Sequence, residues 1–333
     1  MRTFLRTLSL FLIPFLALLV LYFVWDPFRV VYHHAPYYKD GDFIGINRGY
    51  ASTMTYTEQK ALYKYDSFIF GNSRSISFRS EDWKQFLPDS SSCFHFDASG
   101  GSVLGLYEKF SYIDRCGGTI RNALFVIDNS LLDRYEMDGH LFEPAPVLKG
   151  NNFQYWMKFH MDNIKAFLTP SFFFAVVDFS LFRKLRPYMG FMVDDRHFVY
   201  KCKTNDIYNE EAEMKMSSGE YYNQDRFKVF ENAQFPGEQS TYSLNDRKIA
   251  LLHKIKDILN EHNTSYKIVI SPLYDQVKLN KETIQVLCAI FGDNNVYDFS
   301  GPNKWNADYH NYYEASHFRP HVARELMSLI YIE

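Results

Sequence analysis

Two parts of the chain, residues 65–130 and 243–333, alternate short apolar runs with amphipathic segments. The apolar runs are nearly continuous, which is typical of strands that are buried on both faces of a parallel sheet. They predict strands at 66–71, 93–101, 123–128, 266–273 and 295–301, the second of which runs into a loop of small residues. Apolar residues at helical spacing predict helices at 102–114, 243–263, 281–292 and 318–332.

This order of strands and helices predicts an α/β fold with a doubly wound, mainly parallel five-stranded sheet of the flavodoxin-like type. Ligands of such sheets bind beyond the carboxyl ends of the strands. The turns that we expect to gather there are 71–75, 98–102, 128–130, 271–275 and the segment after 300. Candidate chemistry is therefore sought in these turns.

Residues 131–242 interrupt the alternation between the third and fourth predicted strands. The first part of this insertion is rich in aromatic residues and Met and is predicted to be helical, and a polar segment follows up to about 240. We expect a helical subdomain packed on the sheet, and a lid or a partner-docking surface is the alternative.

The N-terminus carries an uncharged apolar stretch from Leu8 to Trp25, which gives about 27 Å of helix. Arg2 and Arg6 precede it, which favours a cytoplasmic N-terminus and a translocated remainder. Residues 1–25 are thus predicted to be an uncleaved transmembrane anchor, with Tyr22 and Trp25 at the interface. A cleaved signal peptide is the alternative, but no small-x-small cleavage site follows the stretch.

Residues 26–64 separate this anchor from the α/β domain at 65–333 and are predicted to be an irregular juxtamembrane segment rich in Tyr and His. His33 and His34 within it are interpreted as part of an interfacial segment rather than as metal ligands. The body of the protein would then lie outside the cytoplasm on a single tether.

Composition narrows the classes of function. A chain that is 47% hydrophobic and 18% aromatic is not mainly disordered, and a net charge of −3 gives no support for a nucleic-acid partner. The cluster Arg183-Lys184-Leu185-Arg186 is interpreted as a solvated helix end. The four cysteines show no metal-ligand spacing, so no metal or other cofactor is predicted, while Cys93 and Cys116 are either bridged or independent thiols.

The stretch "FIFGNSRS" places Ser73 directly after the first predicted strand. A serine at a strand-to-helix turn has its hydroxyl above the sheet, near the N–H groups of the following helix. Such a residue is either a nucleophile or simply a helix N-cap.

The segment "NYYEASHFRP" near the C-terminus contains what a nucleophilic serine would need. Three-residue spacing in a tight turn allows the Glu314 carboxylate to hold one nitrogen of His317 while the other nitrogen faces a serine. Asp308 and His310 are a rival acid and base. The turn after the fifth strand brings either pair to the same end of the sheet as Ser73.

A third element is the loop "DASGGS", in which Gly100 and Gly101 allow a backbone N–H to approach a ligand closely, although Gly-Gly is also a common turn signal. With "GNSRS" and the C-terminal acid-x-x-His, the chain resembles the SGNH (GDSL-like) hydrolase superfamily. With its predicted N-terminal anchor and Gly-x-Ser-Arg, it is similar to the membrane-anchored extracytoplasmic type, which includes the alginate O-acetylation and teichoic-acid D-alanylation proteins.

The resemblance covers residues 64–130 and 245–333, and it implies roles for particular residues. Ser73 matches the nucleophile, His317 the base and Gly101 the second-block oxyanion donor, while Glu314 replaces the usual aspartate. The chain departs from the family in having Asn72 where Asp is usual, and in lacking the third-block Gly-x-Asn-Asp. Asn129 in "IDNS" stands near that place as the amide donor. Asn72 is still predicted, with Gly101 and Asn129, to take part in oxyanion or substrate binding.

The leading hypothesis is a membrane-anchored serine esterase or O-acyltransferase that acts on a cell-surface polysaccharide or polymer through an acyl-serine intermediate. The resemblance implies the bacterial cytoplasmic membrane, an extracytoplasmic (periplasmic) domain, a surface glycan as substrate and a multi-spanning membrane acyltransferase as partner. The alternative is a catalytically inactive SGNH-like module that binds a glycan or scaffolds a membrane acylation complex. A metal phosphoesterase is disfavoured because no ligand cluster has suitable spacing.

Overall fold

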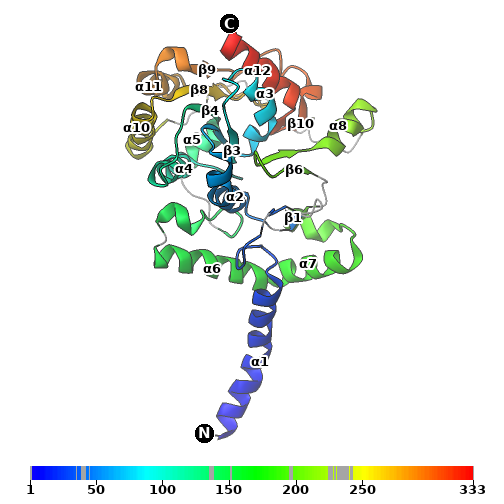
Figure 1. Ribbon diagram of the computed structural model, residues 1–333. Helices are drawn as coiled ribbons and strands as arrows, with labels where there is room; N and C mark the ends of the chain where they lie inside the picture. The colour runs from blue at the N-terminus through cyan, green and yellow to red at the C-terminus, as the bar shows by residue number, and fades with distance from the viewer. Residues whose placement is uncertain are drawn as a thin grey trace.

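The computed structural model describes residues 2–34, 36–38, 43–44, 46–134, 139–150, 152–194, 198–223, 228, 230, 240 and 243–332. Figure 1 shows three tiers along the molecule. The helix α1 (Arg2–Trp25) projects from one end, helices α6 (Phe153–Leu168) and α7 (Pro170–Phe182) lie across its inner end, and the α/β body follows.

The centre of the body is a five-stranded sheet in which every neighbouring pair of strands is parallel. Its order is β3-β2-β4-β8-β9, which is the flavodoxin-like order 2-1-3-4-5 when these strands are counted along the chain. The predicted fold class is therefore confirmed at this level. The strands are β2 (Ser67–Gly71), β3 (Cys93–Asp97), β4 (Asn122–Ile127), β8 (Ser265–Ile270) and β9 (Val296–Asp298).

Helices cover both faces of this sheet, because alternate strand residues point to opposite sides. Phe68 and Phe70 pack into one core, whereas Ile69 packs into the other. The first core is covered by α2 (Arg48–Tyr63), α4 (Val103–Arg115), α10 (Asp246–Glu261) and α11 (Lys281–Phe291). The second is covered by α3 (Ser80–Lys84) and α12 (Pro320–Ile332).

The helix α2 corrects the prediction that residues 26–64 are irregular. Asn47 caps it by accepting a hydrogen bond from the Tyr50 N–H, and the helix packs beside β3. The pattern of apolar residues did not reveal it because much of its buried face is polar, including Arg48, Ser52, Thr53 and Thr55. Arg48 is buried because it forms an ion pair with Asp97 at 2.7 Å.

The insertion at 131–242 is only partly helical. It contains α5 (Asn129–Asp133) at its start, the 3-10 turn η2 (Pro146–Lys149), and then α6 and α7, which are predicted correctly as helices. It continues through η3 (Pro187–Met192), β5 (Val193–Asp194), β6 (Val199–Lys201), β7 (Asp206–Tyr208) and α8 (Glu210–Ser217). The strand β5 pairs with β1 (Phe43–Ile44), and β6 pairs with β7. Most of the predicted polar segment after 223 lies outside the described residues.

Among the described residues, no single helix is both long and apolar enough to cross a membrane. Within α1, the apolar helical segment Leu12–Trp25 is shorter than a membrane span requires. The helices α6 and α7 meet the criteria of length and composition only together, with a bend of 71° between them.

Candidate active site

Ser73 lies at the topological switch point of the sheet, where the chain leaves β2 between β3 and β4. It is the first residue of the 3-10 turn η1 (Ser73–Ser77) and is half-buried. Asn72 caps this turn, because its Oδ1 accepts a hydrogen bond of 3.0 Å from the Arg74 N–H. The serine is therefore held directly beyond the carboxyl end of a buried strand.

His317 lies in a tight hairpin of β10 (Tyr312–Glu314) and β11 (His317–Phe318). The His317 Nε2 atom lies 2.8 Å from the Ser73 Oγ atom. On the other side of the ring, His317 Nδ1 is hydrogen-bonded to Glu314 Oε1, and the second oxygen of Glu314 accepts the Ser316 N–H at 2.8 Å. The structure thus brings Ser73, His317 and Glu314 together in the order of a serine-histidine-carboxylate triad.

Both members of the acid-base pair are reachable from solvent, with side-chain exposures of 35% for His317 and 32% for Glu314. Partial burial raises the pKa of Glu314, but its hydrogen bonds and its attraction to His317 and Arg74 outweigh this, so that the pKa lies below its usual value. Glu314 is then a carboxylate at neutral pH. Because a carboxylate only accepts hydrogen bonds, Glu314 favours a ring proton on Nδ1 of His317, and Nε2 then faces the Ser73 hydroxyl.

Arg74 connects the serine turn to the histidine hairpin. Its Nε donates to the Ser316 carbonyl at 3.2 Å, and its Nη1 donates to Ser130 Oγ at 2.6 Å and to Asp128 Oδ2 at 3.1 Å. Ser77, in the same turn as Arg74, donates to the Phe318 carbonyl. Sequence reasoning missed the role of Arg74, although its position directly after the serine was a signal available in the motif.

The side chain of Asn72 is buried and holds the turn through both ends of its amide. Its Nδ2 donates to Asp128 Oδ2 at 2.7 Å, while its Oδ1 caps the turn. Burial raises the pKa of Asp128, but Arg74 and the hydrogen bonds from Ser130, Asn72 and Leu131 outweigh this and keep the carboxyl ionised. These contacts give the Asn72 side chain a structural role in the turn. Its predicted role in oxyanion or substrate binding stays a prediction.

Gly101 lies against the serine turn, as its predicted role requires. A methyl group added to Gly101 would lie 3.5 Å from the Gly71 carbonyl and 3.6 Å from Asn72. Neither the Ser73 N–H nor the Gly101 N–H has a hydrogen-bond partner among the residues that the structure describes. These two donors are the natural candidates for an oxyanion hole. Asn129, the third predicted contributor, is half-buried and starts α5 directly after β4.

The rival pair forms a separate contact. His310 Nδ1 is 2.7 Å from Asp308 Oδ1, and both side chains are exposed. Within the described chain it is His317, and not His310, whose ring nitrogen meets Ser73.

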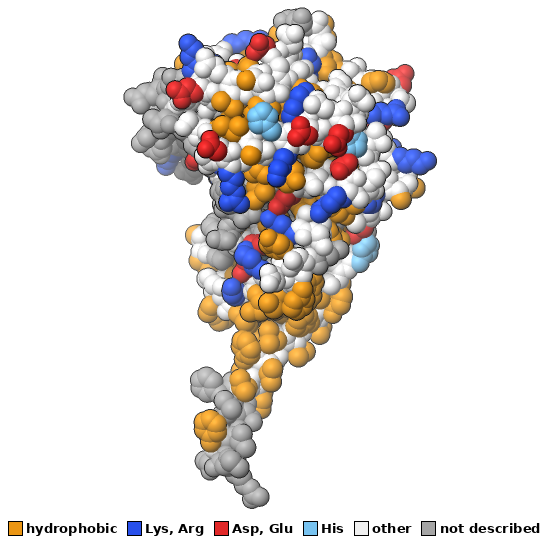
Figure 2. Space-filling model, turned by 90° about the vertical axis from the view of Figure 1, so that its left-hand side faces the viewer, with side chains coloured by type: hydrophobic (Ala, Val, Ile, Leu, Met, Phe, Trp, Pro, Cys, Tyr) orange, Lys and Arg blue, Asp and Glu red, His pale blue; other side chains and the backbone are white. Residues whose placement is uncertain are grey.

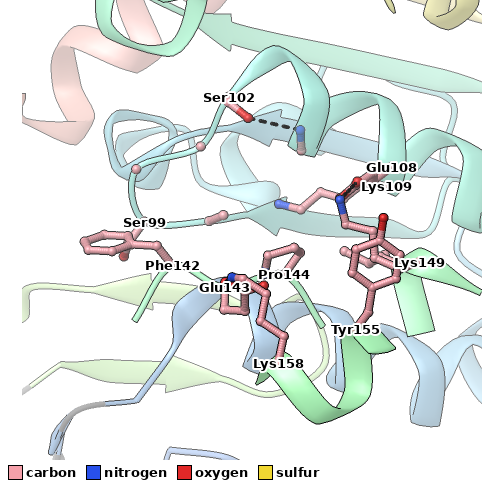
Figure 3. Close-up of a pocket in the computed structure, with 16 residues that line it drawn as sticks. Ser99, Ser102, Glu108, Lys109, Phe142, Glu143, Pro144, Lys149, Tyr155 and Lys158 are labelled. Carbon is pink, nitrogen blue, oxygen red and sulfur yellow. Dashed lines mark hydrogen bonds and ion pairs between the residues drawn. The ribbon is translucent and has the colours of Figure 1, made fainter. Parts of the chain in front are cut away.

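A pocket adjoins the Gly100–Gly101 segment, with a volume of about 140 Å³. Figure 3 shows Ser99 and Ser102 along one side of it, and Phe142, Pro144 and Tyr155 on the other. Two ion pairs between lysines and carboxylates, Lys149–Glu108 and Lys158–Glu143, belong to its lining. Lys109 also lines the pocket, and burial lowers its pKa to about 7. Sequence reasoning did not predict this pocket, because its walls come from segments far apart in the chain.

The remaining candidate ligands are dispersed. Among the described residues, no group of three or more His, Cys, Asp or Glu side chains is arranged to hold a metal ion. His33 contacts Glu58 and His34 contacts Asp26. All four cysteines, including Cys93 and Cys116, are free thiols. Comparison of the sequence with protein-family models and with curated proteins finds no match.

Proposed function

We propose that this protein is a serine esterase or O-acyltransferase of the SGNH type, with Ser73 as nucleophile. The observation that carries the proposal is the 2.8 Å contact between Ser73 Oγ and His317 Nε2, with Glu314 bound to the other ring nitrogen. Three groups from two distant segments meet in the order that acyl transfer needs, at the switch point of the sheet.

The reaction follows from this arrangement. The Ser73 oxygen attacks the carbonyl carbon of an acyl ester while His317 Nε2 takes the hydroxyl proton. The negative oxygen of the tetrahedral intermediate accepts hydrogen bonds from the N–H groups of Ser73 and Gly101, with Asn129 as a further donor. The protonated His317, stabilised by Glu314, gives the proton to the leaving alcohol, and an acyl-serine remains. Water or a sugar hydroxyl then attacks the acyl-serine, with His317 again as base, and Ser73 is regenerated.

We assign the acceptor to the pocket beside Gly101. Its rim of paired lysines and carboxylates offers donors and acceptors for sugar hydroxyls, and Phe142 and Tyr155 provide apolar faces. The substrate class is therefore a polysaccharide or another polyhydroxylated polymer of the cell surface. Changing Tyr155 to Ala should raise the KM for such an acceptor while leaving the rate of Ser73 acylation unchanged, as measured with a small activated ester.

The proposal includes a bilayer as partner of α1, with the α/β body on the extracytoplasmic side of a bacterial cytoplasmic membrane. It is supported by the uncharged stretch from Leu8 to Trp25 and by the preceding Arg2 and Arg6. A multi-spanning acyltransferase that delivers the acyl group is the partner such a transferase would need.

The test is acylation of the full-length protein by p-nitrophenyl acetate, followed by peptide mass spectrometry. We expect an acetyl adduct on Ser73 that is absent in Ser73→Ala and strongly reduced in His317→Ala. The variant His310→Ala is the matched control, because it removes a nearby histidine that also contacts a carboxylate but does not meet the serine. Equal background rates in all four proteins, with no adduct, would overturn the proposal and favour the inactive binding module.

A further inference from the structure

The helix α6 carries more apolar surface than the body of the protein covers. Its buried stripe is Phe159, Asn163 and Phe167. Beside it, at the same spacing of four residues, Phe153, Met157 and Met161 form a second stripe that is exposed, with Phe153 at 68%. A helix on a water-exposed surface normally has polar residues outside its buried stripe.

The helix α7 repeats this feature. Its residues Phe172, Ala175, Val176 and Phe179 are buried against the body. On the opposite side of the helix, Phe174 and Leu181 are exposed, with Leu181 at 71%. The one charged residue within this helix, Asp178, is paired with Arg186 just beyond the helix end.

Both helices lie where α1 joins the body. Figure 1 shows α6 and α7 running across the inner end of α1, and the ring of Phe167 in α6 packs against Tyr22 and Trp25 at 5.4 and 6.3 Å. The exposed apolar residues of α1, such as Ile13 and Val24, continue this surface along the tail. Figure 2 shows hydrophobic side chains gathered at the narrow end of the body and along the tail below it.

We propose that α6 and α7 form an interfacial platform, lying in the plane of the bilayer at the boundary of headgroups and acyl chains, around the point where α1 enters the membrane. The proposal rests on the bilayer placement of α1 in the proposed function. Lipid is the occupant that fits, because the apolar surface of the platform is continuous with that of α1 and the platform lies across its axis.

The charged residues of α6 indicate that this helix lies on the membrane surface rather than crossing the bilayer. Lys158 pairs with Glu143 of the body, and Asp162 pairs with Lys165 at 3.0 Å. These charges suit an interface with water and would be costly at the centre of a bilayer. Arg183 and Lys184, both exposed after α7, lie where anionic headgroups would attract them.

The platform also determines where the pocket beside the active site lies. Tyr155 and Lys158 of α6 line that pocket, while Phe153 and Met157 belong to the exposed stripe of the same helix. The pocket would therefore open close to the membrane surface, within reach of an acceptor that is still attached to a lipid carrier.

The experiment uses the full-length protein in nanodiscs of phosphatidylcholine and phosphatidylglycerol, with bromine placed either near the headgroups or near the ends of the acyl chains. The quenching of Trp156, an exposed residue of α6, is obtained by subtracting the signal of Trp156→Phe. We expect headgroup-proximal bromine to reduce this signal by about twofold or more, and deep bromine to have little effect. Trp305, buried in the second core of the body, is the matched control through Trp305→Phe and should not be quenched.

Each other outcome overturns a defined part of the proposal. Quenching of Trp25 without quenching of Trp156 would overturn the platform and leave the anchor intact. Quenching of neither tryptophan would overturn both. Strong quenching of Trp156 by deep bromine would show that α6 enters or crosses the bilayer instead. As an independent check on α7, Leu181→Trp in the Trp156→Phe background should show the same shallow quenching.

Discussion

Two serines of the same turn, Ser73 and Ser75, each contact a histidine whose other ring nitrogen meets a carboxylate. Ser73 contacts His317 at 2.8 Å, with Glu314 behind it. Ser75 contacts His95 Nε2 at 2.9 Å, and His95 Nδ1 lies 3.1 Å from Asp206. The order of contacts, serine to histidine to carboxylate, is the same in both clusters, although the acid is Glu314 in one and Asp206 in the other.

The two clusters differ in access and in where the serine proton goes. Ser75 and His95 are fully buried, whereas His317 is about one-third exposed. The Ser75 hydroxyl also donates to the Asn72 carbonyl at 2.7 Å, so that its proton is committed to the backbone of the turn. A triad of residue types is therefore not enough for catalysis. The serine must be reachable, and its proton must be free to move to the histidine.

The buried cluster instead stabilises the turn that carries Ser73. Asp206 of β7 accepts hydrogen bonds from Thr204 at 2.6 Å and from Ser80 at 3.1 Å as well as contacting His95. Because Asp206 belongs to the insertion and Ser75 to the serine turn, this network fixes the insertion to the edge of the sheet where Ser73 lies.

The largest expected effect comes from exchanging the two serines for alanine. Ser73→Ala should lower the acylation rate by about 10³-fold or more, because among the described residues Ser73 is the serine whose hydroxyl contacts His317 Nε2. Ser75→Ala should retain most of the acylation rate but lower the free energy of unfolding by about 1–2 kcal/mol, because a buried hydrogen bond is lost. Ester hydrolysis and urea unfolding of both variants measure this. The comparison fails if Ser75→Ala is the inactive one while still folded.

The next effect concerns Asp206, the carboxylate of the buried cluster. Asp206→Asn should lower the free energy of unfolding by about 2–3 kcal/mol, since an amide cannot accept from all the donors that surround it. The pair Asp82–Arg324, a long contact of 3.5 Å to an arginine that is about half exposed, supplies the control, and Asp82→Asn should cost no more than about 1 kcal/mol. Thermal and urea unfolding give both values. Equal effects of the two substitutions would show that the buried cluster has no special structural role.

A smaller effect is expected for Arg74, which connects the serine turn to the hairpin of His317. Arg74→Lys keeps the charge but loses the planar guanidinium that bonds Ser316, Ser130 and Asp128 together, and should slow acylation about tenfold. Arg79→Lys is the control within the same segment, because Arg79 stacks on Tyr208 and should leave the rate unchanged. An unaltered rate in Arg74→Lys would show that the hairpin holds its position without this contact.

The smallest effect is the pH dependence of the stability that Glu314 contributes. The lowered pKa of Glu314 means that the stability it contributes is present above its ordinary value of 4.5 and is lost as the pH falls through the lower, folded value. The difference in unfolding free energy between the wild type and Glu314→Gln should therefore be constant near neutrality and shrink below pH 4.5. Urea unfolding from pH 7 to pH 3 measures it. A difference that grows on acidification would contradict the ionised Glu314.

The strands were predictable from the sequence because burial on both faces leaves them almost purely apolar. Ser73, Glu314 and His317 were predictable as a group because each lies in a turn at a known end of the sheet, and the spacing of Glu314 and His317 is local. Their catalytic roles stay predictions until the acylation experiment is done.

Other parts depended on contacts that no local pattern encodes. The helix α2 buries polar residues, so its apolar periodicity is weak. The network of His95 joins a strand residue to Asp206, which is 111 positions away, and the anchoring of Arg74 requires Asp128 on the neighbouring strand end. Asp128 also accepts a hydrogen bond from the Asn72 Nδ2, so this contact of Asn72 could not be predicted from the sequence of the turn alone.

The Ser73–His317 contact joins residues that are 244 positions apart in the chain. During synthesis the serine turn emerges long before the hairpin of β10 and β11 is made. A partly made chain would hold Ser73 without His317. The proposed activity would therefore begin only when the C-terminal hairpin and α12 have folded onto the body.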